Sequence, residues 1–160
     1  MKSIVIRGNI DKLIHEADSM GKLDDTDSEE IKLPPIVTVI PTFMEEKWIE
    51  KCLRSLMLQT YPNELHMIHV VDGGSTDRTR EIVKQMIDES EESDGPQIFL
   101  IDNPDKFVPH ARNISLSQMP KEVELVFEMN SHGWVPQDHL VTRVNDLLNL
   151  EEEIGREIGG

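Results

Sequence analysis

Short runs of apolar, mostly β-branched residues alternate with longer amphipathic segments from Ile36 onward. Such runs predict strands, and the segments between them predict the crossover helices of a mainly parallel sheet. Strands are expected at 36–40, 66–71, 98–101 and 124–129. Apolar positions at helical spacing predict helices around 49–57, 75–87 and 140–148, and Pro109, which fits the first turn of a helix, predicts another that carries 111–117. The pattern therefore indicates an α/β fold with three layers, α/β/α.

Turn and capping residues refine the ends of two of these elements. Pro41 is expected to end the first strand. The turn Asp72-Gly73-Gly74-Ser75 leads from the second strand into a helix, which Ser75 or Thr76 can cap. Asp77 suits the positive end of the same helix.

The first part of the chain differs from the rest. Residues 1–33 hold one short apolar piece and an acidic run at 24–30. Pro34-Pro35 closes this part, because two successive prolines remove two backbone donors and disfavour helix before them. We therefore expect an acidic appendage or linker at 1–33, of open role, and one domain at 34–160, as the length of 160 residues also favours.

The balance of charge excludes one class of function. The chain has 16 Lys and Arg against 31 Asp and Glu, and its net charge of −15 repels nucleic-acid phosphates.

The one cysteine, Cys52, allows no intramolecular disulfide and is interpreted as a small core residue. No apolar segment of the sequence is long enough for a signal peptide or a membrane span. These features predict a cytoplasmic protein without nucleic-acid partners; peripheral attachment to a membrane stays open.

Polar or glycine-rich residues follow three of the predicted strands. They are Pro41-Thr42-Phe43, Asp72-Gly73-Gly74-Ser75 and Asn130-Ser131-His132. Because ligands of open α/β sheets bind outside the carboxyl ends of the strands, these segments predict one rim suited to a nucleotide. The glycine-rich signatures of dinucleotide-binding and P-loop proteins are missing, so hydride transfer and P-loop chemistry lose support. The two glycines fit close approach to a ligand or, equally, a tight turn with positive φ.

Several segments together resemble family 2 glycosyltransferases in their order and spacing. They are Val39-Ile-Pro-Thr-Phe-Met-Glu-Glu, Leu53-Arg-Ser-Leu with Gln59-Thr-Tyr-Pro, Val70-Val-Asp-Gly-Gly-Ser-Thr-Asp-Arg-Thr and Ala111-Arg-Asn. The resemblance covers about 36–160 and implies a GT-A fold that binds a nucleotide-diphosphate sugar, a UDP- or GDP-sugar, usually with Mn²⁺ or Mg²⁺. It also implies transfer of the sugar, with inversion, to an unknown glycan or lipid-linked acceptor in polysaccharide or glycan biosynthesis.

The resemblance also implies which residues bind the substrate. They are Pro41, Thr42, Phe43, Glu45, Asp72, Gly74 and Arg112. Asp72 should hydrogen-bond the base, and Arg112 should lie near the donor, where a guanidinium can pair with the diphosphate. Three simpler interpretations stay open: Phe43 as a core residue, Glu45 as an acid that favours a helix N-terminus, and Arg112 as a surface arginine paired with a carboxylate.

The chain departs from the family pattern at three positions. Gly73 stands where a second Asp is frequent, and Met44 stands where Asn is common, with the loss of one polar contact. The metal motif, Asp-x-Asp or Asp-x-His, falls on Asn130 and His132, so an amide replaces the first carboxylate. Because Mg²⁺ and Mn²⁺ prefer carboxylate oxygen, we expect a weakened metal site, with a hydrogen-bonded loop histidine as the alternative for His132. Glu128 is close in sequence, but strand alternation does not decide whether it reaches the site.

The acceptor-binding half of the family has no counterpart in the sequence, which ends at Ile158-Gly159-Gly160 where the family has a further strand. We therefore expect a truncated fold and assign no catalytic base. Three explanations of the missing half stay open: the chain is a fragment of a longer transferase, it is a shortened relative, or another subunit completes it. An uncovered sheet edge favours a homo-oligomer. The competing function is a non-catalytic nucleotide-sugar-binding or interaction module. Nucleotidyl transfer is disfavoured, because no loop rich in Gly and Arg follows the first strand.

Overall fold

The structure, a computed structural model, describes residues 33–158. Its strands are β1 Ile36–Thr42, β2 His66–Asp72, β3 Gln97–Asp102 and β4 Leu125–Glu128. Its helices are α2 Ile49–Met57, α3 Thr79–Glu92, α4 Val108–Gln118 and α5 His139–Ile158, with a short 3-10 helix, η1, at Asn63–Leu65. The predicted appendage at 1–33 lies outside the described residues except for Leu33, so the domain boundary stays a prediction.

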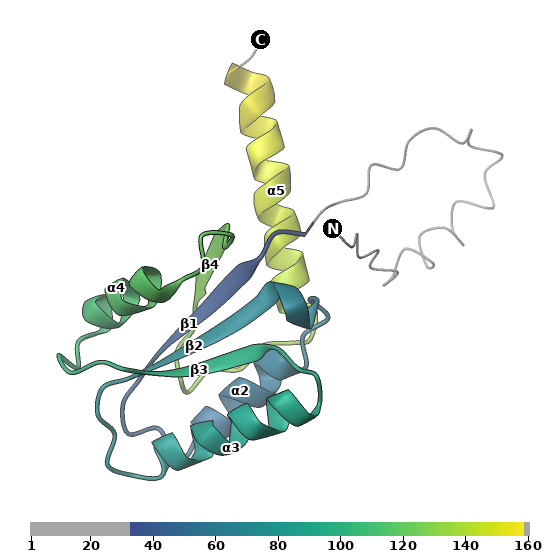
Figure 1. The fold of residues 1–160 in the computed structure, drawn as a ribbon. Coiled ribbons are helices and arrows are strands. Elements are labelled where there is room, and N and C mark those ends of the chain that lie inside the picture. Colours follow the sequence, from purple (N-terminus) through teal and green to yellow (C-terminus); the bar gives the residue numbers. More distant parts are fainter. Residues whose placement is uncertain (1–32, 159–160) are drawn as a thin grey trace. The chain divides into compact units, whose positions relative to one another are not determined.

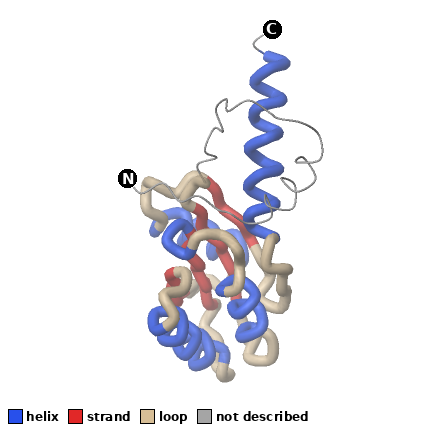
Figure 2. The backbone as a smooth tube through the Cα atoms, turned by 90° about the vertical axis from the view of Figure 1, so that its right-hand side faces the viewer, coloured by secondary structure: helices blue, strands red, loops and turns tan. Residues whose placement is uncertain are grey.

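The strands form one parallel sheet in the order β3-β2-β1-β4. Helices α2 and α3 cover one face of the sheet and α4 covers the other (Figure 1). The view in Figure 2 shows helices on both sides of the strands. Because both faces are covered, β1 and β2 are buried along almost their whole length, as is usual for central parallel strands. The predicted α/β/α fold with a parallel sheet is confirmed.

Two groups of buried side chains hold the layers together. Between the sheet and α2 and α3 lie Ile40, Ile49, Cys52, Leu53, Leu56, Ile68, Val70, Ile82, Val83, Met86 and Ile98. Between the sheet and α4 lie Val37, Val39, Val71, Ile101 and Ala111. The buried face of α2 is the predicted apolar stripe, and each fully buried Leu or Ile contributes about 1.5–3 kcal/mol.

The structure corrects the end of the first strand, because β1 continues through Pro41 to Thr42. The Thr42 carbonyl accepts from Gly73 N at 2.8 Å on the β2 side, and the Val39 carbonyl accepts from Met129 N at 3.0 Å on the β4 side. Successive residues of a strand direct their peptide groups to alternate sides, so Pro41 points toward β4, whose pairing with β1 ends at Val39. Its missing N–H therefore costs no ladder hydrogen bond.

The structure also corrects the start of the second helix. α3 begins at Thr79, without a side-chain cap at the residue before it, so the predicted capping by Ser75 or Thr76 is wrong. The Ser75 hydroxyl donates to Asp72 instead, and Thr76 is exposed. Asp77 does lie at the positive end of the helix, where its Oδ1 accepts from Thr79 N at 3.0 Å.

The last helix, α5, is longer than predicted. Leu140 and Val144 are buried, as its apolar spacing predicted. A strand was expected to begin at Ile158, but this residue is the last of α5, and Gly159 and Gly160 lie outside the described residues. Within residues 33–158, the structure contains no helix with the length and apolar character that crossing a membrane requires.

Candidate functional site

The parallel register brings the carboxyl ends of three strands side by side. Thr42 at the end of β1 pairs with Asp72 at the end of β2, and Asp72 pairs with Asp102 at the end of β3. The loop after β4 follows the same edge of the sheet, because all four strands run parallel. This edge is the place where open α/β sheets bind ligands.

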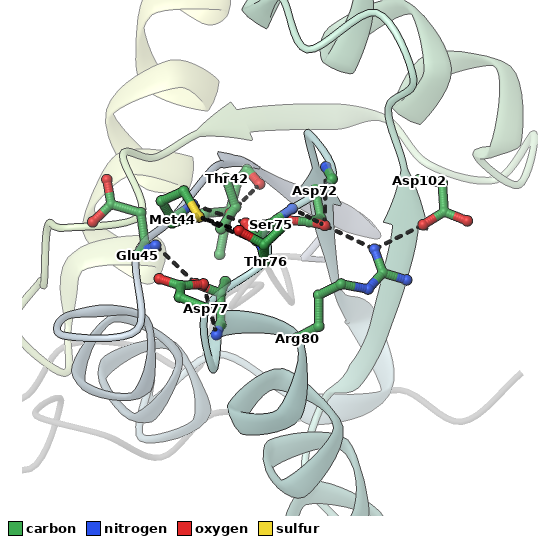
Figure 3. Close-up of polar contacts among 12 residues, drawn as sticks. Thr42, Met44, Glu45, Asp72, Ser75, Thr76, Asp77, Arg80 and Asp102 are labelled. Atoms are coloured by element: carbon green, nitrogen blue, oxygen red, sulfur yellow. Dashed lines mark hydrogen bonds and ion pairs between the residues drawn. The ribbon is translucent and has the colours of Figure 1, made fainter.

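Asp72 is a carboxylate at the centre of this edge, and its side chain has 0% of its surface exposed. Its oxygens accept from Ser75 Oγ at 2.5 Å, from Ser75 N at 3.0 Å and from Gly74 N at 3.2 Å. Arg80 Nη1 donates to Asp72 Oδ2 at 2.8 Å (Figure 3). A buried charge is tolerated when it is paired and hydrogen-bonded, and these contacts meet both conditions. The predicted base-binding carboxylate is therefore fully engaged inside its own turn.

Sequence reasoning did not identify Arg80 and Asp102. Arg80 Nη1 lies 2.8 Å from Asp102 Oδ1 as well, so one guanidinium joins the ends of β2 and β3 (Figure 3). The hydrogen bond to Asp72 raises the pKa of Arg80, against the lowering effect of partial burial. No sequence signal could have paired these residues, because the contact depends on the register of β3 against β2.

The loop between β1 and α2 is tied to the start of α3. Met44 N donates to Ser75 Oγ at 2.8 Å, and Glu45 N donates to Thr79 Oγ1 at 2.8 Å. Met44 has φ 56°, in the left-handed region that Asn tolerates better than most residues. Gly74 has φ 81°, so a tight turn is sufficient reason for that glycine.

The other predicted residues of β1 differ in their exposure. Thr42 is buried, and its hydroxyl donates to the carbonyl of Ile40 at 3.0 Å. Pro41 is partly buried, whereas Phe43 lies at the rim with 49% of its surface exposed. Phe43 is therefore not a core residue, and of the three it is the one most exposed to solvent.

Arg112 lies on α4, and its guanidinium is bonded to Glu128 at the end of β4. Arg112 Nη2 donates to Glu128 Oε1 at 2.8 Å, and Nε donates to Oε2. The hydrogen bond between them raises the pKa of Arg112 and lowers the pKa of Glu128. Both side chains are substantially exposed, and such surface pairs contribute little to stability. Glu128 takes two of the five N–H donors of the Arg112 guanidinium, so this pair leaves three for another anion.

Cys52 is a buried residue of α2, as the sequence predicted. Burial and, to a smaller extent, the charge of Glu45 raise the pKa of its thiol to about 12. The thiolate is the nucleophilic form of cysteine, so Cys52 is a packing residue and not a nucleophile.

A family model described as Glycosyl transferase family 2 matches residues 37–154 of the chain. The chain belongs to this family. Among curated proteins, it is 29% identical over 118 residues to the dolichyl N-acetyl-alpha-D-glucosaminyl phosphate 3-beta-D-2,3-diacetamido-2,3-dideoxy-beta-D-glucuronosyltransferase of Methanococcus voltae. The match covers 74% of this chain and 35% of that protein, so the chain spans about a third of this relative's length.

Solved structures of glycosyltransferases have the same fold as this family 2 chain. The mannosyltransferase PcManGT from Pyrobaculum calidifontis, in complex with GDP-Man and Mn²⁺, superposes with a TM-score of 0.59 at 22% identity, over 79% of this chain and 36% of that one. S. aureus TarS 1-349, in complex with UDP, superposes with a TM-score of 0.56 at 24% identity, over 74% of this chain and 32% of that one. The predicted GT-A fold is confirmed.

The two residues at which the sequence predicts a metal site, Asn130 and His132, lie in the loop after β4. His132 Nδ1 lies 3.2 Å from Glu45 Oε1, and Asn130 is exposed in the same loop as His132. Among the residues that the structure describes, no three His, Cys, Asp or Glu side chains are grouped to hold a metal ion. Magnesium, however, is commonly bound by one or two carboxylates together with substrate phosphates. A divalent cation at this loop would therefore need substrate phosphates as further ligands.

Proposed function

We propose that this chain is the donor-binding part of a glycosyltransferase that binds a UDP- or GDP-sugar and transfers the sugar to an acceptor with inversion. The observation that carries the proposal is the Asp72 turn. One buried, fully bonded carboxylate links the ends of β2 and β3 and, through Ser75, the loop after β1. A rim held in this way can position a ligand at the carboxyl edge of the sheet. The two solved neighbours, which are complexes with GDP-Man and with UDP, support a nucleotide donor.

The binding site for the nucleotide sugar in this proposal consists of the residues that the resemblance implies. They are Pro41, Thr42, Phe43, Glu45, Asp72, Gly74 and Arg112. Asp72 contributes by holding the turn in shape, and it could meet a base only if one of its internal partners left. Arg112 contributes through the N–H donors that Glu128 does not use, because a guanidinium offers phosphate oxygens several donors and a fixed positive charge. That charge offsets the negative charge that develops on the leaving diphosphate.

A divalent cation, Mn²⁺ or Mg²⁺, would be held by Glu45 and His132, with Asn130 in the same loop. When bound, it would stabilise the negative charge of the leaving diphosphate as a Lewis acid. We expect a weaker affinity than that of a motif with two carboxylates, because imidazole and amide are poorer ligands for these hard ions.

No residue of this chain is assigned to acceptor binding or to the role of catalytic base. The proposed acceptor is a glycan or a lipid-linked glycan, in keeping with the name of the Methanococcus voltae relative. Since the chain spans about a third of that relative's length, acceptor binding is assigned to further sequence, to a completing subunit or to a second copy. A cytoplasmic location stays a prediction.

A non-catalytic nucleotide-sugar-binding module is the second candidate. Asn130 in place of a carboxylate favours it, and so does the pairing of Arg112 with Glu128, because both weaken the stabilisation of a leaving diphosphate. This candidate predicts binding without turnover, and binding that does not depend on Mn²⁺.

Calorimetric titration with UDP, GDP and their sugars, with and without Mn²⁺, tests both candidates. Binding should disappear in Asp72→Ala, in which the turn loses its central acceptor, while Asp88→Ala removes an exposed carboxylate of α3 and should bind as the wild type does. Circular dichroism should show that both variants are folded. Metal-dependent binding would support the transferase, and metal-independent binding without turnover would support the module. Absence of binding by the folded wild type would refute both.

A further inference from the structure

The outer face of α2, opposite the side that packs on the sheet, exposes large apolar side chains. Residues at helical spacing share this face: Trp48, Lys51, Ser55 and Leu58. Cys52 N donates to the Trp48 carbonyl at 3.0 Å, which keeps Trp48 in register with the helix. Trp48 is 37% exposed and Leu58 is 60% exposed. The side of α2 that faces away from the core is therefore not the polar surface usual for a helix packed on a sheet.

The loop after β4 adds a second tryptophan to the same face. Val135 N donates to Ser55 Oγ at 3.3 Å, so this loop lies along the helix. Trp134 is 55% exposed, and Lys51 Nζ lies 3.2 Å from the centroid of its ring. Both tryptophans of the chain are therefore exposed on one surface, although tryptophan is on average a highly buried residue. Exposed apolar groups gathered in this way mark a contact with another molecule or with a membrane.

The same surface carries two lysines without a negative partner. Lys47 Nζ lies 4.7 Å from the centroid of the Trp48 ring, and Lys51 has the corresponding cation–π contact with the second tryptophan. In residues 33–158, neither lysine forms an ion pair. Glu50 lies between them in sequence but pairs with Arg54 at 2.9 Å. We call the following residues the tryptophan face: Lys47, Trp48, Lys51, Leu58 and Trp134.

This combination of residues has the chemistry of a membrane surface. An indole ring has an apolar body and one N–H donor, and proteins place it at the level of the lipid headgroups. A lysine lays its stem along apolar groups while its ammonium reaches lipid phosphates. Protein interfaces are also enriched in tryptophan, but they are depleted in lysine. The pairing of each tryptophan with an uncompensated lysine therefore favours lipid over a protein partner.

We propose that the tryptophan face is a membrane-contact surface, which seats the chain on a phospholipid bilayer that contains anionic lipid. The indole rings and Leu58 enter the headgroup region, and the two lysines bind lipid phosphates. The net charge of −15 opposes this contact, but charges farther than about 8 Å from the lipid are largely screened at physiological ionic strength. The inference is independent of nucleotide binding, because the tryptophan face includes no residue proposed to hold the nucleotide sugar or the cation. It places the chain where a lipid-linked acceptor would be found.

Vesicles of phosphatidylcholine and phosphatidylglycerol in equal parts test the inference with the full chain. Because both tryptophans lie on the tryptophan face, a blue shift of the intrinsic emission reports on that face directly, and co-sedimentation gives the partition coefficient. Trp134→Ala should lower the partition coefficient about tenfold, with Trp48 as the remaining reporter. Lys51→Gln should lower it about fivefold, and Lys51→Arg should restore most of the loss.

The matched control is Lys121→Gln, which removes an exposed lysine from the segment between α4 and β4 and should bind vesicles as the wild type does. Circular dichroism should show that all variants are folded. The inference fails if the folded wild type does not bind the vesicles. It also fails if Trp134→Ala or Lys51→Gln binds them as the wild type does. A blue shift that grows with protein concentration in the absence of vesicles would assign the tryptophan face to a second copy of the chain, and would overturn the inference as well.

Discussion

Acidification should destabilise the fold through His66, the first residue of β2. His66 is 1% exposed, and its Nε2 lies 2.9 Å from the hydroxyl of Thr38 on the neighbouring strand. Burial lowers the pKa of His66 from 6.5 to about 4, because the charged imidazolium cannot keep its hydration inside the core. The unfolded chain takes up the proton first, so this stabilisation is fully present above pH 6.5 and is lost as the pH falls toward 4.

The size of the effect follows from the two pKa values. With 6.5 for the unfolded chain and about 4 for the folded one, the free energy of unfolding falls by about 2 kcal/mol between pH 7 and pH 5. That is a large part of the ~5–15 kcal/mol that stabilises a typical domain. His69 acts in the same direction, because burial also lowers its pKa, so the His66 share has to be isolated by mutation.

Urea unfolding of wild type and His66→Gln at pH 7 and pH 5 isolates that share, since glutamine keeps a polar partner for Thr38 but does not titrate. The variant should lose about 2 kcal/mol less than the wild type on acidification. His110→Gln serves as the control, because His110 is an exposed histidine. If His66→Gln and the wild type showed the same dependence on pH, the assignment of a neutral, buried His66 would be refuted.

Two further predictions concern buried polar groups. Arg80→Met should lower the free energy of unfolding in urea by about 1–3 kcal/mol, because it leaves the buried Asp72 carboxylate without a cation; Arg80 is a third exposed, which keeps the loss below that of a fully buried pair. An unchanged urea midpoint would show that the backbone donors alone suffice for Asp72. The Cys52 thiol, with its pKa raised to about 12 by burial, should resist a thiol reagent at pH 8 in the native protein and react fully in denaturant. Rapid labelling of the native protein would contradict the burial of Cys52.

The elements of this fold could be predicted from the sequence because their signals are local. The apolar stripe at Ile49, Cys52, Leu53 and Leu56 repeats with the period of a helix, and it is the buried face of α2. The β-branched runs likewise predicted each strand, with errors only at the ends. The family could be predicted for a similar reason, because its motifs are short local segments that occur in a set order along the chain.

The ends of the elements were decided by neighbours distant in sequence. Pro41 does not end β1, although it has no N–H to donate. Its peptide group faces β4, and the pairing of β1 with β4 already ends at Val39. Ser75 does not cap α3, because its hydroxyl donates to Asp72 and accepts from the N–H of Met44, a residue of a different loop. The bond from Ser75 to Asp72 is local, but the bond from Met44 and the pairing of β1 with β4 involve segments distant in sequence, which no sequence window contains.

The candidate site divides in the same way between sequence and structure. The sequence by itself determined that Asp72, the glycines after it and Phe43 stand at strand ends, because a polar residue after an apolar run marks the carboxyl edge of a parallel sheet. Only the tertiary structure decided that Arg80 joins Asp72 to Asp102 and leaves the Asp72 carboxylate buried. The physical reason is that burial, ion pairing and stacking depend on distances between strands, and those distances exist only after the sheet has formed its register.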